Sequence, residues 1–317
     1  MAASSPLPSR PIFDNYRGPA FNPTNVLLAL LFGGVIATSF QQTHFSLTEP
    51  FTPQNARNVA RFVGGLFPPA LDAQFLRSIG SLVLETVFIS IAGTSLAFVL
   101  ALPLALGALR VRGEEVSYAA IGPLRSAVRW AIWGGARLIL NFARAIPELV
   151  WALIFVVAVG LGAFPGVLAL GVHSAGILGK LYAELLESVD QRVVESARAT
   201  GASELAVTMF ARVPLALPVL FSYTLFRWEC NMRAATVLGF VGAGGIGTQL
   251  SISMKLFRYD EVLTLALTIL LLVTLVDLVG SVARARVLDA PTVAHCAPDQ
   301  RPGLVGRALA FFGRGDS

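Results

Sequence analysis

Long apolar runs dominate this 317-residue chain and limit what it can fold into. Hydrophobic residues make up 55% of the chain and charged residues only 14%. An ordinary soluble domain carries roughly 25% charged residues. A chain this poor in charge cannot cover a surface that faces water, and several of its apolar runs have the length that a bilayer-spanning helix needs. We therefore expect an all-α integral membrane protein.

About six stretches are apolar enough to span a membrane. They are residues 25–40, 81–109, 136–162, 167–186, a run that starts at 215 and breaks near 239–247, and 262–282. This pattern predicts five segments along the chain. They are a polar N-terminal segment at 1–24, a first transmembrane helix at 25–40, an extracytoplasmic loop at 41–78, a core domain at 79–288, and a disordered tail at 289–317.

Arginines indicate how the chain is oriented. The basic segments at 110–129 and 192–212 and the pair Arg284 and Arg286 share one side if the spans alternate. The positive-inside rule makes that side the cytoplasm, so we expect both termini inside the cell and residues 41–78 outside. The net charge of +5 does not indicate nucleic-acid binding, because no basic helix is interleaved with aromatic residues.

The polar stretch between two spans at about 190–213 predicts two short cytoplasmic helices. Alanines together with Glu195 and Arg198 favour a helix, which Gly201 can end in a left-handed cap. Ser203 can then cap a second helix, and Pro214 is placed to start the next span. The expected product is a compact helix–turn–helix that presents small residues and a few charges to a partner.

The spacing within residues 195–214 resembles the coupling motif of ABC-importer permeases. The motif positions here are Glu195, Ser196, Ala197, Gly201, Ala211, Val213 and Pro214. Ser196, Ala211 and Val213 depart mildly from the usual Ala, Ile and Leu. In that family the loop docks in a groove of the ATPase subunit and carries its motion to the spans.

Further stretches resemble the phosphonate-uptake branch of these permeases. They are residues 144–153, 179–184, 226–229, 234–247 and 256–262, and the likeness covers roughly 75–288. The resemblance implies a type I ABC importer (MetI-like) permease fold in the bacterial plasma (inner) membrane. It also implies a translocation path for phosphonate, with phosphate or phosphite as further cargoes.

The same resemblance implies a set of partners. They are a second copy of this chain in a homodimer, two cytoplasmic ABC ATPase subunits and an extracytoplasmic phosphonate-binding protein. Such a subunit has no catalytic, cofactor or metal residues of its own, because ATP and Mg²⁺ are bound by the ATPase. Gly242, Gly244 and Gly247 match a dinucleotide-binding spacing, but the strand and the soluble βαβ unit that this motif needs are missing from the pattern.

Ionisable groups and glycines within the spans are candidates for the translocation path or its gate. The candidates are Arg144, Pro147, Glu148, His173, Lys180, Glu229, Arg233, Gly242, Gly244, Gly245 and Gly247. A glycine run at membrane depth predicts a broken helix that protein or water must cover. Each charge also has a plainer interpretation, in which partners four residues apart neutralise each other: Arg144 with Glu148, Lys180 with Glu184, and Glu229 with Arg233.

Two alternatives stay open on the sequence alone. One is the same kind of permease with another small solute such as methionine as cargo. The other is a secondary transporter or channel that works alone, although it would be expected to show inverted repeats and no docking motif. A membrane enzyme is disfavoured, because His44, His173 and His295 fall in different compartments under this topology.

Overall fold

The computed structural model describes residues 23–43, 52–110 and 123–288. Most of the N-terminal segment expected at 1–24 and the tail expected at 289–317 lie outside the described residues. The chain divides into two units, Met1–Gly64 and Gly65–Ser317, and each is described by itself.

The described residues of the first unit form two helices. Helix α1 (Pro23–Gln42) has no charged residue over its 20 residues, as suits a span. Helix α2 (Pro53–Gly65) lies inside the stretch expected to be a loop at 41–78. Its apolar residues Val59, Phe62 and Val63 recur at helical spacing, a periodicity that marks an amphipathic helix within that stretch.

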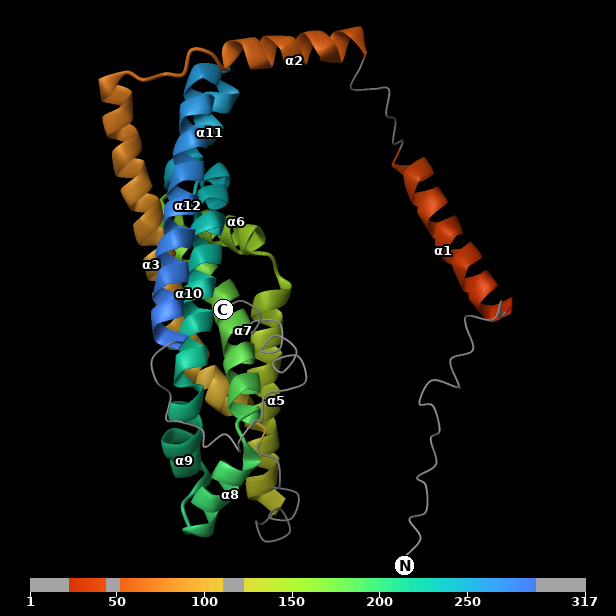
Figure 1. Cartoon of the computed structure of the whole chain (residues 1–317), viewed down its shortest axis with the longest axis vertical. Helices are drawn as coiled ribbons and strands as arrows, with labels where there is room; N and C mark the ends of the chain where they lie inside the picture. The colour runs from red at the N-terminus through yellow and green to blue at the C-terminus, as the bar shows by residue number, and fades with distance from the viewer. Residues whose placement is uncertain (1–22, 44–51, 111–122, 289–317) are drawn as a thin grey trace, which may run out of the picture. The chain divides into compact units, whose positions relative to one another are not determined.

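In its described residues, the second unit is a bundle of long helices with shorter helices at its ends and side (Figure 1). The long helices are α3 (Ala73–Ala108), α5 (Pro123–Ala145), α7 (Ala163–Glu187), α10 (Val213–Leu238) and α12 (Tyr259–Leu288). The short ones are α6 (Glu148–Val159), α8 (Gln191–Ala199), α9 (Glu204–Val207) and α11 (Ile246–Lys255). Helices α8 and α9 lie at one end of the bundle and α11 at the other.

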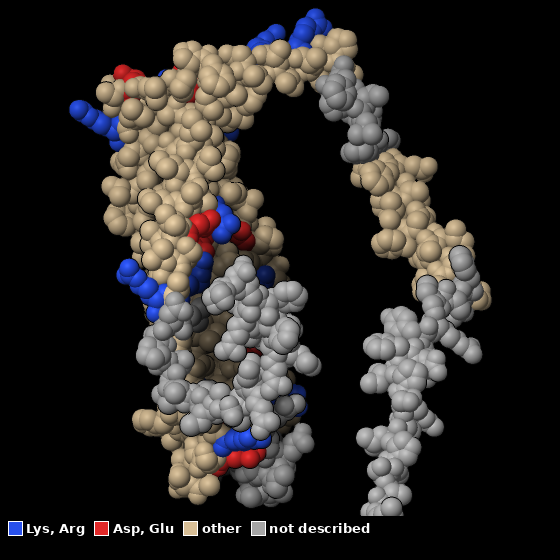
Figure 2. Space-filling model, viewed as in Figure 1, with Lys and Arg blue, Asp and Glu red and all other residues tan. Residues whose placement is uncertain are grey.

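Helix length and composition agree with a multi-span membrane protein. Five helical segments of the described residues are long and apolar enough to cross a membrane, or six if one bent pair is counted as a span. Many large apolar side chains are exposed on these helices, and charged groups are separated by broad uncharged areas of the bundle surface (Figure 2). Helix α3 begins six residues before the expected core boundary at 79, because Asp72 caps it by accepting from the backbone N–H groups of Gln74 and Phe75.

The stretch expected to be one span at 136–162 is two helices. Helix α5 ends at Ala145 and α6 starts at Glu148, with a bend of 91° between them. Pro147 causes the break, because proline has no N–H to continue the ladder and disfavours the helical conformation of Ile146 before it. Proline also starts the new helix, since its carbonyl accepts from the N–H groups of Val150 and Trp151.

Small residues bring the helices of the bundle close together. A Cβ on Gly93 of α3 would lie 2.7 Å from the Leu170 side chain of α7, and one on Gly176 of α7 would lie 2.7 Å from the backbone nitrogen of Arg144. Buried alanines of α3 complete this contact: Ala97, Ala101, Ala105 and Ala108. Close backbone approach through small residues is the usual way in which helices associate in lipid.

One glycine of α12 makes room for a buried charge. Glu229 of α10 has a side chain that is 4% exposed and forms an ion pair with Arg284 of α12. A Cβ on Gly280 would overlap with the Glu229 carboxylate. The glycine therefore lets α12 cover the carboxylate while the arginine neutralises it.

We predict that Gly280→Ala destabilises the bundle, because the Glu229 side chain is held by Arg284 and cannot move aside cheaply. The expected cost is about 1–3 kcal/mol, as for overpacking of a core. Gly134→Ala is the matched control, since a Cβ there meets nothing within 4 Å. Thermal unfolding of the detergent-solubilised protein measures both variants, and equal midpoints would contradict the packing argument.

Candidate functional site

The segment between α7 and α10 has the turn and the cap that its sequence predicts. Gly201 has a φ of 80°, in the left-handed region that glycine adopts without strain, and its N–H donates to the Arg198 carbonyl at 2.9 Å. The Ser203 hydroxyl then caps α9 by accepting from the Ala206 N–H at 3.3 Å. Two short helices therefore meet at a glycine turn at the end of the bundle.

Two arginines fix this segment in place. Arg198 of α8 donates two hydrogen bonds to the Glu204 carboxylate of α9, from Nε to Oε1 at 2.7 Å and from Nη2 to Oε2 at 3.1 Å. Arg212 is 1% exposed and donates from Nη1 to the Leu186 carbonyl near the end of α7 at 3.3 Å. Glu195 and Ser196 stay exposed on α8. The segment is therefore held against the bundle while its outer face is free for contact.

Pro214 was expected to start a new span, separate from the second short helix. The second short helix instead continues into the span without a break. A π-helical turn, Thr208–Arg212, joins α9 to α10, and residues Glu204–Val241 form one helical run. In this turn the Val213 N–H reaches back to the Thr208 carbonyl. Proline lacks an N–H and its ring crowds the carbonyl four residues earlier, so a widened turn lets the helix pass through Pro214 instead of ending there.

The pair expected between Arg144 and Glu148 does not form. The Pro147 bend lies between the two residues, so they no longer share a helix face. Arg144 instead donates from Nε to the Asn141 amide oxygen at 3.1 Å. Glu148 lies 3.3 Å from Nε2 of His173, whose Nδ1 is 2.9 Å from the Ile146 carbonyl. His173 thus connects α7 to Ile146 before Pro147 and to Glu148 after it.

The prediction that Glu229 pairs with Arg233 is also wrong. Both residues face α12 rather than each other: Glu229 pairs with Arg284, and Nη2 of Arg233 lies 3.6 Å from the Asp277 carboxylate. Asp277 and Arg284 are seven residues apart and share one face of α12, so the two oppositely charged pairs link α10 to α12 across the interface. The expected Lys180–Glu184 pair is present at 3.5 Å.

A cavity of ≈ 190 Å³ lies between α5, α7 and the end of α3. The described residues of its lining include three cations and no carboxylate: Ala108, Arg137, Leu140, Asn141, Arg144, Lys180 and Ala183. Arg137 was missed by the sequence reasoning, although positions 137, 141 and 144 fall on one helical face. That spacing of polar residues in an apolar stretch is the signal that identifies it.

The charges around this cavity are only partly neutralised. Arg137 donates to Glu187 at 2.9 Å and to the Ala108 carbonyl at 3.2 Å, and Lys180 has Glu184. Within the described part of the chain, Arg144 contacts only the neutral amide of Asn141, and its side chain is exposed. The cavity can therefore attract a small anion without binding it tightly.

A buried polar network that the sequence reasoning overlooked crosses the centre of the bundle. The Asn231 amide accepts from the Ser174 hydroxyl at 2.7 Å and donates to the Thr94 hydroxyl at 2.9 Å. Arg227 donates to the same Ser174 oxygen at 2.9 Å, and the Trp228 indole donates to the Ser90 hydroxyl at 3.2 Å. Polar residues of three spans that satisfy one another fix the register of α3, α7 and α10.

The glycine run after α10 breaks the helix, as predicted. Gly242, Gly244 and Gly245 have φ of 84°, 82° and 75°, and α11 starts at Ile246. The freed backbone is covered by protein: Gly242 accepts from the Gly162 N–H at 2.9 Å. The Ile246 N–H donates to the Thr86 hydroxyl at 2.9 Å. The break is therefore packed between α3 and the start of α7.

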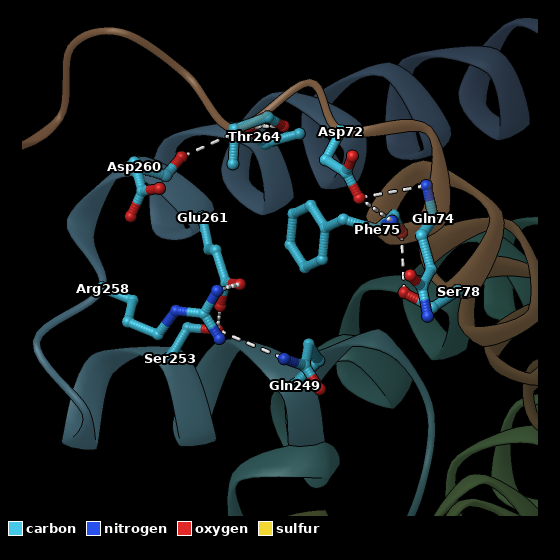
Figure 3. A network of polar contacts seen from close by, with 11 residues as sticks. Asp72, Gln74, Phe75, Ser78, Gln249, Ser253, Arg258, Asp260, Glu261 and Thr264 are labelled. Carbon is cyan, nitrogen blue, oxygen red and sulfur yellow. Dashed lines mark hydrogen bonds and ion pairs between the residues drawn. The ribbon is translucent and has the colours of Figure 1, made fainter.

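The end of the bundle at α11 has a polar network of its own (Figure 3). The Glu261 carboxylate, 4% exposed, accepts from the Ser253 hydroxyl at 2.7 Å and pairs with Arg258, which is exposed. Next to it, Thr264 donates to the Ala70 carbonyl at 2.9 Å. These contacts join α11, α12 and the entry to α3, and they leave the Arg258 side chain on the surface.

Comparison with known proteins agrees with this architecture. Residues 118–289 match the family described as "Binding-protein-dependent transport system inner membrane component". The phosphite transport system permease protein PtxC of Stutzerimonas stutzeri is 40% identical over 81% of this chain and 87% of its own length. The phosphate-import permease protein PhnE of Mycolicibacterium smegmatis is 34% identical over 80% of this chain and 46% of its own length.

A solved structure shares the fold. It is a chain of the MetNI methionine ABC transporter in inward-facing conformations, with a TM-score of 0.54 and 21% identity over 68% of this chain and 99% of that one. The family match covers more than half of the chain, and the helices have the length and composition of spans. The chain therefore belongs to the binding-protein-dependent transport system inner membrane components, the multi-pass permeases of ABC importers.

Proposed function

We propose that this permease carries a small phosphorus oxyanion (phosphonate, phosphite or phosphate) past the cations that line the cavity between α5 and α7. The names of its relatives support this class of cargo, since they are phosphite and phosphate permeases. The single observation that carries the proposal is the cationic cavity itself, with Arg137, Arg144 and Lys180 in its wall.

The depth of these cations is what gives them a function. Arg137 contacts Glu187, the last residue of α7, so the two helices are level there. Arg144 and Lys180 each lie seven residues from that level, or about 10 Å at 1.5 Å per residue. Charges at this depth cannot face lipid and require water or protein in front of them. The face of α5 and α7 that bears them therefore faces a second subunit or a water-filled path.

The chemistry of the cavity suits transport rather than tight storage. A guanidinium can present two N–H groups to two oxygens of a tetrahedral anion. The partners already present on Arg137 and Lys180 weaken their hold on a passing anion, and release is as necessary as entry. Arg144, which has only an amide partner among those described, supplies the strongest attraction.

We infer that residues 195–214 couple this path to a separate ATPase. The outer face of α8 with Glu195 and Ser196 is the docking surface, and Ala197 lies half-buried beneath it. Movement passes to the spans by two routes: through the Arg212–Leu186 contact to α7, and through Ala211, Val213 and Pro214 into α10. Rigid links of this kind let a small displacement at the surface turn whole helices.

The complete transporter would contain two permease halves, two ATPase subunits that bind ATP and Mg²⁺, and an extracytoplasmic binding protein. We propose a homodimer, because the charged face of α5 and α7 needs a covering subunit. The α8–α9 end would face the cytoplasm of a bacterial cell with both termini on that side. The Gly242–Gly247 break, with Arg258 beyond it, would lie toward the binding protein and act as the outer gate.

We predict that Gly201→Val abolishes ATP-driven uptake and leaves membrane insertion intact. A β-branched residue is strained at a φ of 80°, so the turn between α8 and α9 would open. Uptake in whole cells and the amount of protein in isolated membranes measure the two effects.

Gly201→Asn is the matched control, because asparagine tolerates the left-handed conformation better than other side chains. We expect it to keep most of the uptake. A Gly201→Val variant that transports normally would refute the coupling function of this turn.

We predict that Arg144→Gln lowers the maximal rate of anion uptake by about tenfold, on the order of one charge-assisted contact. Arg144→Lys should keep part of the activity, since the charge stays while the two-pronged geometry is lost. Arg233→Gln tests the other candidate of the path, which the structure pairs with Asp277. If Arg144→Gln transports at the normal rate while complex assembly is unchanged, the cavity is not on the path.

A further inference from the structure

A second cavity lies at the α8–α9 end of the bundle, apart from the one proposed for the cargo. It has a volume of ≈ 260 Å³ and lies between the end of α3, the first half of α5 and the short helix α9. Its lining combines cations, tryptophans and aliphatic side chains: Leu106, Gly107, Leu109, Arg110, Arg129, Trp130, Ile132, Trp133, Glu204, Leu205 and Thr208.

The polar part of this lining is positive. The Arg110 guanidinium lies over the Trp133 ring, 5.8 Å from its centroid, and Arg129 is the second cation of the wall. Glu204 is the one carboxylate among the described lining residues, and both its oxygens accept from Arg198. Among the described lining residues, cations therefore outnumber carboxylates, which favours an anionic ligand.

An apolar stripe on α5 continues from the cavity along the bundle. Ile132 lines the cavity and is 57% exposed, and Ile139 and Phe142 follow it on the same face at 51% and 59%. The steps from 132 through 135 to 139 and 142 alternate between three and four residues, as on one side of a helix. Gly135 leaves open space between them, since a Cβ there would meet nothing within 4 Å.

The order of these groups along the bundle matches a lipid. Arg110 lies just beyond the end of α3, and Arg129 is within the first two turns of α5, so the cations are near the membrane surface. Ile139 and Phe142 lie further along α5, toward the interior of the bilayer. Trp130 and Trp133 lie between the two, at the depth where tryptophan rings meet headgroups.

We propose that this cavity and stripe bind an anionic phospholipid, with its phosphate at Arg110 and Arg129 and an acyl chain along Ile132, Ile139 and Phe142. A free phosphate ion would need the cations but would leave the stripe unused. A neutral lipid would use the stripe but gain little from two arginines. Because α9 supplies Leu205 and the π-helical turn supplies Thr208 to the wall, the bound lipid bridges two spans and the coupling segment.

The test uses the purified transporter complex in neutral detergent and counts bound lipid by native mass spectrometry. Dioleoyl-phosphatidylglycerol should bind at least tenfold more tightly than dioleoyl-phosphatidylcholine. The double variant Arg110→Gln with Arg129→Gln should reduce its affinity by about thirtyfold, since each basic group near a membrane surface supplies on the order of 1 kcal/mol and about 1.4 kcal/mol is a factor of ten. Arg286→Gln, an exposed arginine near the end of α12, is the matched control and should bind as the parent does.

A second pair of variants covers the case in which the arginine variant fails to assemble. Leu205→Asp places a carboxylate in the cavity at a side chain that is 65% exposed, and it should repel the anionic lipid. Phe210→Asp, on an 84% exposed side chain outside the lining, should not. Equal binding of the two lipids, unchanged binding in Leu205→Asp, or displacement of the lipid by millimolar inorganic phosphate would overturn the proposal.

Discussion

The pairing of charged side chains among apolar spans is the constraint on which the rest of the structure depends. A bilayer offers no water to a buried charge, so each one must find a partner, a cavity or a second subunit. Glu229 meets this requirement inside the bundle by pairing with Arg284. Arg233 and Asp277 form a second, half-exposed pair, and both pairs link α12 to α10. Arg144 does not meet it within the described part of one chain, and this is why its face is inferred to line a path.

Charged side chains also connect the coupling segment, residues 195–214, to the bundle. Arg198, Arg212 and Arg137 each join two elements: α8 with α9, the π-helical turn with α7, and α5 with α7. Glu187, the partner of Arg137, also accepts from the Arg110 backbone N–H at 2.6 Å. The end of α7 is therefore a junction between the docking surface, the cargo cavity and the proposed lipid site.

Local features of this fold could be predicted from the sequence, and pairings between helices could not. The Gly201 turn, the Ser203 cap and the glycine break follow from the conformations that single residues favour. The predicted pairs Arg144–Glu148 and Glu229–Arg233 do not form, because a bend separates the first two residues and the neighbouring helix α12 offers partners to the second two. The π-helical turn at Pro214, the helix at 53–65 and the network around Asn231 depend on packing that the spacing of residues does not encode.

The central claim is that this chain moves an oxyanion only when a partner ATPase drives it. The most direct measurement is uptake of radiolabelled phosphite and methylphosphonate into proteoliposomes that contain the permease, its ATPase and its binding protein. The account predicts uptake that requires hydrolysable ATP on the α8–α9 side and does not depend on an ion gradient. Uptake by the permease alone, driven by a proton or sodium gradient, would contradict it.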